Sequence, residues 1–519
     1  MKAVLFVLVL GALSQAPDFD SAVMLISGAS CMEELDESTL ERFRALSLHP
    51  VDLNGASRSR LLATGLMSAF QVASLIDWRT SSGDILSYSE LALIYGFNEE
   101  YAAALKLFTR LESSGAPGER RRGPLRHEVM IRSSARTDLL NPAETAAGMK
   151  YRASLGETVE LNWSTRTTYS SHSPGIGTVS AALYGRRKLG KLVLGHFNAR
   201  FGQGQVLWSG FAMQPYGSVT SFRKSGTGFS PTGSFSAEFC GAAADFEFGR
   251  WNVAAAYSFK EQLPMAALSY CSRWFTAGAT CSGKAFGADF KLGLRNLALF
   301  GEAAWRGEPA LAAGLIWVPA YGSKTGLLCR WTGGPTEVLA GASLKSLEAV
   351  ASYSAGQQRC FIKYCPELHA GPVSLAPSLR LAAKHTQAWR LESRGELRAG
   401  MGPATLNCRL DVVKCKAPAW LCNAEAGYVA DKLKCWLRWT LFCVDNWDDR
   451  IYVYERDAPG SFNVPAYYGR GWAMSFAGAW RPHFKHRVYW RVSYIAYPWM
   501  TTEKPQRFEV KLQYNVSIR

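Results

Sequence analysis

The chain has 519 residues, a formal charge of +16 and a sequence pI near 9.3. Its 17 Trp, 21 Tyr and 26 Phe exclude extended disorder, because they supply ample apolar surface. No run of about 20 apolar residues follows the N-terminus, which excludes a helical membrane protein. A mean hydropathy of −0.06 with 47 Gly leaves a soluble all-β protein or a transmembrane β-barrel.

The N-terminus has the pattern of a secretory signal peptide. Lys2 supplies a positive charge, Ala3 to Leu13 form a short apolar run, and Ser14-Gln15-Ala16 is a small-x-small cleavage site. We therefore expect residues 1–16 to be removed on export. An alternative processing site is Cys31, where Gly28-Ala29-Ser30-Cys31 resembles a lipoprotein box.

The charge is unevenly distributed along the chain. Residues 31–112 hold 12 acidic and 7 basic side chains, a net charge of −5, whereas residues 127–519 carry +19. The positive excess therefore belongs to the long C-terminal part.

Residues 31–112 have helical spacing. Apolar positions predict a helix over 33–48, and the next helices are expected over 58–63, 68–78, 88–94 and 99–111. Ser57, Ser68 and Asn98 are good N-caps for three of them, and Gly65 and Gly96 end the helices that precede two turns.

Residues 51–111 resemble a pair of helix-hairpin-helix units of the competence-protein type. Leu53-Asn54-Gly55-Ala56-Ser57, the turn Thr64-Gly65-Leu66-Met67, the pair Trp78-Arg79 and the turn Tyr95-Gly96-Phe97-Asn98 carry the resemblance. The family's turns contain a Pro and a second Gly that are missing here.

The resemblance implies contact with nucleic acid, because exposed backbone N–H groups in such turns bind DNA phosphates. The residues so implied are Gly65, Leu66, Met67, Gly96, Phe97, Asn98, Arg58 and Arg60. The acidic balance of this region favours the alternative, a helical module that docks on a protein partner or plugs the barrel.

Residues 113–126 are a basic linker, with four Arg against Glu119. Such a run is typical of a solvated connection, and contact with nucleic acid or lipid phosphate is the alternative.

From residue 127 onward the sequence alternates with a period of two. Leu433 to Cys443 and Phe508 to Ile518 place apolar side chains on one face and polar side chains on the other. In an exported chain this predicts a mainly β fold: a transmembrane antiparallel β-barrel of about 16 strands, preceded by a small all-α helix-hairpin-helix domain.

Three segments are similar to exported barrel proteins in which helix-hairpin-helix units precede the barrel. They are 201–211, 448–457 and 465–471. The resemblance implies an outer-membrane location for 127–519 and a periplasmic location for 31–112. It implies no enzyme activity.

The 12 cysteines are many for an exported barrel. The alternation places Cys329, Cys408, Cys422, Cys435 and Cys443 on apolar faces, as small lipid-facing side chains. Cys360 and Cys365 are the pair most suited to a disulfide, since both flank an expected loop.

No motif for catalysis, a metal or a cofactor occurs, so we expect no enzyme activity, no metal and no cofactor. The sequence thus predicts an outer-membrane barrel in contact with lipid. It either binds or passes nucleic acid or another anionic polymer, or serves as a structural protein whose helical module plugs the barrel or binds an envelope partner.

Overall fold

The computed structural model describes residues 18–518 except 113–123, 139–141, 170, 187, 211–216, 321, 367, 371–372, 460, 462 and 501–504. The signal peptide expected over 1–16 and most of the basic linker lie outside the described residues. None of the helices in this part of the chain has the length and apolar character needed to cross a membrane.

The first part of the chain is helical. Its elements are α2 (Phe19–Ser27), η1 (Met32–Glu34), α3 (Glu37–Leu48), β1 (Val51–Asp52), α4 (Arg58–Thr64), α5 (Ala69–Ser82), α6 (Tyr88–Leu93), α7 (Glu99–Leu105) and β2 (Thr109–Arg110). The expected caps are present: the side chains of Ser57, Ser68 and Asn98 accept backbone N–H groups of α4, α5 and α7. We call Phe19–Leu111 the helical region.

Two helices differ from expectation. The sequence did not predict α2, which starts at Phe19 because the Asp18 side chain caps it by accepting the N–H of Ser21. The last helix was expected to reach residue 111 but ends at Leu105, since Thr109 and Arg110 pair with β1 as a short parallel strand. The pairing joins residues 51–52 to residues 109–110, near the two ends of the segment that resembles helix-hairpin-helix units.

The rest of the chain forms one closed sheet. Its strands are β3 (Leu125–Thr137), β4 (Glu144–Leu155), β5 (Val159–Thr168), β6 (Ser171–Arg186), β7 (Leu189–Arg200), β8 (Gly228–Pro231), β9 (Phe239–Phe248), β10 (Trp251–Ser258), β11 (Leu263–Cys271), β12 (Phe275–Ser282), β13 (Ala285–Leu294), β14 (Leu297–Trp305), β15 (Pro309–Trp317), β16 (Ser323–Thr332), β17 (Glu337–Leu344), β18 (Leu347–Ser354), β19 (Gln357–Tyr364), β20 (Leu368–Ala370), β21 (Val373–His385), β22 (Trp389–Met401), β23 (Ala404–Lys414), β24 (Pro418–Val429), β25 (Leu433–Val444), β28 (Gly469–His483), β29 (His486–Ala496) and β30 (Gln506–Ile518).

The described strands make a closed antiparallel barrel of 24 strands, so the expectation of about 16 strands was wrong. β8 and β20 are short additions, because β7 also pairs with β9, and β19 with β21. The barrel closes between its first and last strands, where Val129 of β3 pairs with Val516 of β30. The expectation assumed long connections, whereas many strands are joined by turns of two residues, such as Gly249-Arg250.

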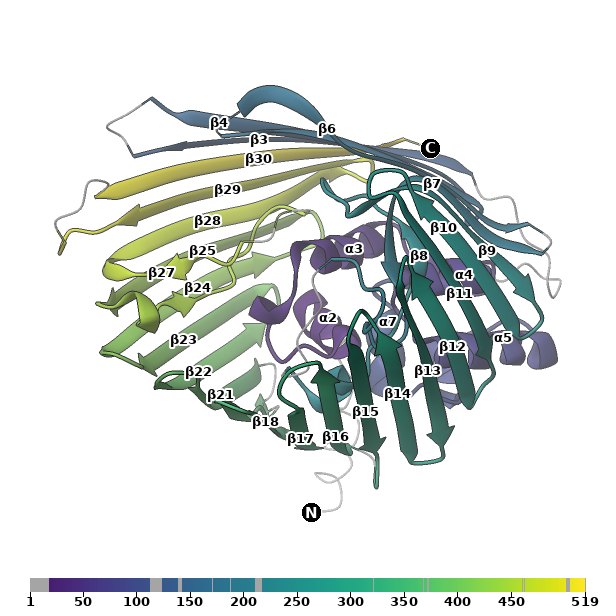
Figure 1. Ribbon diagram of the computed structural model, residues 1–519. Helices are drawn as coiled ribbons and strands as arrows, with labels where there is room; N and C mark the ends of the chain where they lie inside the picture. The colour runs from purple at the N-terminus through teal and green to yellow at the C-terminus, as the bar shows by residue number, and fades with distance from the viewer. Residues whose placement is uncertain are drawn as a thin grey trace, which may run out of the picture.

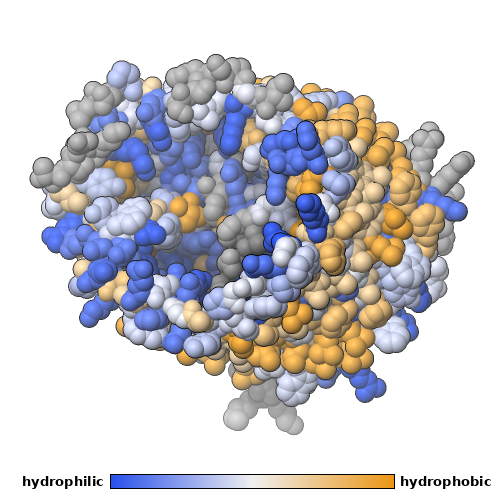
Figure 2. Space-filling view, in the orientation of Figure 1, coloured by the Kyte–Doolittle hydropathy of each residue, from blue (hydrophilic) through white to orange (hydrophobic). Residues whose placement is uncertain are grey.

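The predicted alternation is confirmed. In β30, Leu512 is 52% exposed, whereas the neighbouring Gln513 is 1% exposed and faces the lumen. Exposed Leu, Trp and Phe side chains form the outer surface, while charged residues line the interior (Figure 2). A closed sheet with an apolar outer face and a polar inner face is an outer-membrane-type β-barrel.

Most of the helical region, including α2, α3 and α7, lies inside the barrel, and α5 reaches the edge of the barrel beside β11 and β12 (Figure 1). We call the end at which β3 begins and β30 ends the terminus end, and the opposite one the loop end. The two long connections, 201–238 and 445–468, both leave from the loop end and turn back into the lumen. They contain η2 (Val219–Phe222), η3 (Trp447–Asp449), β26 (Ile451–Tyr452) and β27 (Ala466–Tyr467).

All 12 cysteines, which fall within the described residues, are free thiols, so the expected Cys360–Cys365 disulfide was wrong. Cys360 lies inside β19 and Cys365 follows its end, so five residues of extended chain separate them by about 16 Å.

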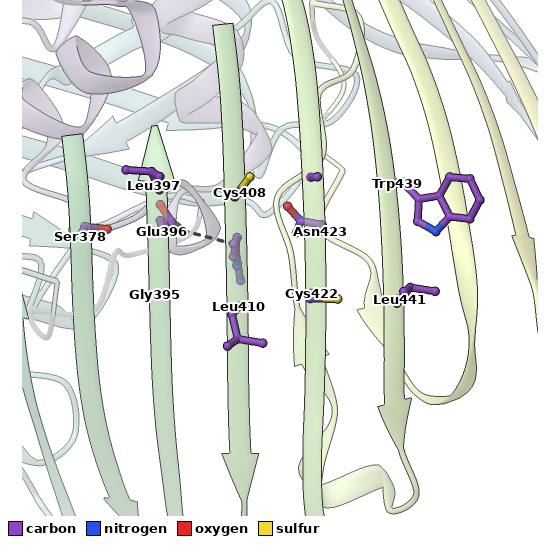
Figure 3. A pocket seen from close by; sticks show the side chains of 12 residues that line it. Ser378, Gly395, Glu396, Leu397, Cys408, Leu410, Cys422, Asn423, Trp439 and Leu441 are labelled. Carbon is purple, nitrogen blue, oxygen red and sulfur yellow. Dashed lines mark ion pairs between the residues drawn. The ribbon is translucent and has the colours of Figure 1, made fainter. Parts of the chain in front are cut away.

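Five cysteines face outward as predicted. In a shallow depression of the outer face, Cys408 and Cys422 lie among the exposed side chains of Leu410 and Trp439 (Figure 3). The other three pair across strands with outward-facing residues: Cys329 with Val338, Cys435 with Tyr428 and Cys443 with Trp420.

Candidate functional site

The candidate site is the contact between the helical region and the barrel lumen. Its centre is Glu33, which η1 holds beside the middle of β22 and β23. The Glu33 carboxylate is 2.5 Å from Arg409 Nη1 and 3.4 Å from Arg394 Nη1. It also accepts the backbone N–H of Tyr454 at 3.1 Å. One side chain therefore joins the helical region, the barrel wall and the 445–468 connection.

The charges around Glu33 hold it ionised. Burial raises its pKa, but Arg394 and Arg409 outweigh burial and hold the pKa of Glu33 well below its usual value. The two arginines are positioned in turn by Asp411, which is 2.8 Å from Arg394 Nε and 2.5 Å from Arg409 Nε. The carboxylate thus meets a preformed pair of guanidinium groups.

The segment before Glu33 is held by both the wall and the 201–238 connection. Gly28 ends α2 with φ 77°, and its carbonyl accepts the Ser218 hydroxyl at 2.6 Å. The Ser30 carbonyl accepts Nζ of Lys363, from β19, at 2.7 Å. The side chains of Val219 and Phe222 then pack against the lumen face of β14–β18.

A second group of contacts surrounds α3 and the 445–468 connection. Arg44 donates to the Ala458 carbonyl at 2.9 Å and to the Tyr454 hydroxyl at 2.9 Å. Glu41 forms an ion pair with Lys150 of β4. The middle of the connection and the barrel wall are therefore both tied to α3, the helix that follows Glu33.

A third group lies at the terminus end. Arg60 of α4 is 2.7 Å from Glu160 of β5 and 3.3 Å from Glu157 of the preceding turn. Ser59 donates to Glu247, at the end of β9. Arg60 was expected from the sequence to meet nucleic acid, and the structure places it against the barrel wall.

The first predicted turn is engaged within the helical region. Gly65 ends α4 with φ 65°, and its N–H donates to the Leu62 carbonyl at 3.0 Å. The N–H of Leu66 donates to the Thr64 hydroxyl at 3.2 Å. The side chains of Leu66 and Met67 are buried.

The second turn is engaged in the same way. The Gly96 carbonyl accepts Nε2 of Gln71 at 2.8 Å, and the N–H of Phe97 donates to the Ile94 carbonyl at 3.0 Å. Asn98 caps α7 by accepting the N–H of Tyr101.

The two turns are neighbours, because the Tyr101 hydroxyl donates to the Leu66 carbonyl. Arg58 donates to the Gly249 carbonyl at 3.3 Å. Nucleic-acid contact by the eight expected residues stays a prediction.

Sequence reasoning missed Glu33, Arg394 and Arg409. A signal was present, since arginines recur on the lumen faces of β22 and β23 while the acidic residues gather in the helical region. Nothing local in the sequence indicates that residues more than 350 positions apart are partners.

No family model and no curated protein matches the chain. Solved structures that resemble it include OpdO of Pseudomonas aeruginosa, at 13% identity and TM-score 0.32, covering 76% of this chain and 96% of that one. The outer membrane protein OpdK of Pseudomonas aeruginosa has 9% identity, TM-score 0.32 and coverages of 76% and 99%. A BenF-like porin from Pseudomonas fluorescens Pf-5 has 10% identity, TM-score 0.32 and coverages of 76% and 98%.

These TM-scores are too low to carry an argument about this chain. Its strand pairing alone establishes the barrel.

Proposed function

We propose that this chain is an outer-membrane channel that its own helical region closes, and that solute passes when this region is displaced. The observation that carries the proposal is the docking of Glu33 on Arg394 and Arg409 in the lumen. A barrel of 24 strands has a wide lumen unless something fills it, as the plugged 22-stranded transporters illustrate.

The helical region is suited to move as one body. Its buried apolar core is built from its own residues between Ala22 and Phe108, and among the described residues only Tyr454 joins that core from the barrel part. The region therefore keeps its core when it leaves the wall.

Its contacts with the barrel are mostly polar. They include the pairs of Glu33 with Arg409, Glu41 with Lys150 and Arg60 with Glu160. Interfaces of this kind resemble those between domains that move relative to each other. The helical region thus binds to the barrel wall through polar contacts, and the two parts do not share one hydrophobic core.

The lengths of the connections at the two ends of the barrel indicate its orientation in the membrane. Outer-membrane barrels have short periplasmic turns and longer extracellular loops. The long connections, 201–238 and 445–468, leave from the loop end. We infer that the terminus end, where α4 meets the wall, faces the periplasm.

Conductance in planar lipid bilayers tests the proposal. The full chain should conduct rarely, whereas a variant lacking residues 18–112 should form a wide, steadily open pore. Heat-modifiable migration on gels confirms that each barrel is folded. A full chain that conducts as widely as the shortened variant overturns the proposal.

A further inference from the structure

A cavity of about 190 Å³ lies between α3, the end of α4 and the barrel wall. Six of its lining residues are basic and three are acidic: Arg42, Arg44, Arg60, Lys150, Arg152 and Arg200 against Glu41, Glu128 and Glu160. The cavity is separate from the Glu33 contact, since none of the residues around Glu33 lines it.

The three carboxylates are already paired. Glu41 pairs with Lys150, Glu128 with His49, and Glu160 with both Arg60 and Arg152. They therefore leave no carboxylate for the remaining arginines of the cavity.

Two of those arginines form no ion pair with a described carboxylate. Within the described residues, the side chain of Arg42 makes no hydrogen bond and no ion pair; it lies over the ring of Phe43, and its Nε is shielded from solvent without an acceptor. Among the described residues, the buried side chain of Arg200 donates only through Nε, to the Ser209 carbonyl at 3.1 Å, and it lies over the ring of Trp208. Arg42 is half-buried and Arg200 is buried, and shielding a guanidinium from water without a compensating carboxylate is costly. Both groups therefore favour an anion in the cavity.

A third group points to the same ligand. The hydroxyl of Thr227 is buried and has no hydrogen-bond partner in the described part of the chain, and Thr227 lines the cavity beside Arg42. Gly65 keeps this place open, because a Cβ there would lie 2.8 Å from Arg42 Nη1 and 3.2 Å from Thr227 Cγ2.

The electrostatic environment of Arg42 also favours a bound anion. Burial, and next the positive Arg200, lower the pKa of Arg42 to about 10, so the charged form of this side chain is disfavoured when the cavity holds no counter-charge. The charge of Asp36 raises the pKa of Arg42, but this carboxylate also caps α3 by accepting the N–H groups of Ser38 and Thr39.

We propose that this cavity binds a small oxyanion, a phosphate or carboxylate group, through Arg42, Arg200 and the Thr227 hydroxyl. Guanidinium groups match both oxyanions in geometry and charge. Because α3 and α4 come from the helical region and Arg200 from the wall, the bound anion joins the two parts. Anion binding here is a function in addition to the proposed passage of solute through the barrel. The site is complete only when the helical region is docked.

Isothermal titration calorimetry on the full chain in detergent tests this site. Inorganic phosphate, acetate and chloride are titrated at matched ionic strength and pH 7. Saturable binding of phosphate, acetate or both at one site per chain, with none for chloride, supports the proposal and tells which oxyanion is preferred. Equal heats for all three anions, or no saturable heat for any, overturn it.

Variants locate the site. Arg42→Gln should weaken the binding by about tenfold or more, since a hydrogen bond to a charged group is lost. Arg306→Gln, on an exposed turn at the loop end, is the matched control and should bind as the natural chain does. Heat-modifiable migration checks folding, and Thr227→Val replaces Arg42→Gln if that variant does not fold. Unchanged affinity in the folded cavity variant overturns the assignment.

Discussion

Glu33 is the residue on which the docked arrangement depends most. It is the one described residue that contacts the two lumen arginines, Arg394 and Arg409, and also the backbone of the 445–468 connection. If Glu33 is replaced, Asp411 is the one remaining carboxylate that pairs with both Arg394 and Arg409.

We expect Glu33→Gln to destabilise docking by about 2 kcal/mol, because charge-assisted hydrogen bonds are lost. The open fraction should then rise about 30-fold, since each 1.4 kcal/mol is a factor of ten. Single-channel recording measures it. Glu99→Gln, exposed at the start of α7, is the control and should leave the open fraction unchanged.

The same carboxylate gives docking a pH dependence. A displaced Glu33 has an ordinary pKa of about 4.3, whereas the docked pKa is well below the usual value. A lowered pKa stabilises the docked form at pH above about 4.3, and this free energy is lost as the pH falls toward the docked pKa.

The contribution of Glu33 should therefore stay constant between pH 6 and 8, and opening should increase only below about pH 4.3. Recording the open fraction against pH measures it. Glu33→Gln should lose the part of the increase that comes from Glu33, and an identical profile in that variant would contradict the assignment.

At the scale of elements, the period of two predicted which strand faces meet lipid, because side-chain alternation is a local property. Leu512 and Gln513 show it in adjacent positions. The number of strands depends instead on connection length, and turns such as Gly249-Arg250 are shorter than composition suggests. Of the segments similar to other exported barrels, residues 201–210, 448–457 and 465–468 belong to the two connections that enter the lumen, and residues 469–471 begin β28, which alternation could not show.

Fixing α4 to the wall should keep the channel closed. A Cβ at position 190 would lie 2.6 Å from Ser59 Oγ, so Ser59→Cys with Gly190→Cys places two thiols within reach of a disulfide. The oxidised double variant should show fewer openings than the natural chain, and a reductant should restore them. Each single variant under the same oxidant is the control, because the 12 native thiols are present in all of them.

At the scale of the whole molecule, the charge partition along the chain becomes complementary in space. Residues 31–112 are acidic and residues 127–519 basic, and the pairs of Glu34 with Arg380 of β21 and of Asp20 with Arg456 of the 445–468 connection join the helical region to the rest of the chain. The sequence predicted the partition but not the pairing, because the partners are hundreds of residues apart and follow no shared pattern.

Removing residues 18–112 should expose the basic lumen. We expect the shortened barrel to prefer anions to cations, because the wall arginines lose their acidic partners. The reversal potential in a gradient of potassium chloride measures the preference. The same variant with Arg394→Gln and Arg409→Gln should be less anion-selective, whereas adding Arg306→Gln should change it little.

The connection between β2 and β3 has a kinetic consequence. Only residues 111–124 separate Arg110 from Leu125, so the chain can extend at most about 50 Å between them. A displaced helical region therefore remains tethered near the mouth of the barrel, at an effective concentration in the millimolar range. Its return is intramolecular and independent of protein concentration. Each opening is then a transient excursion that ends by recapture, without any partner needed to reseal the membrane.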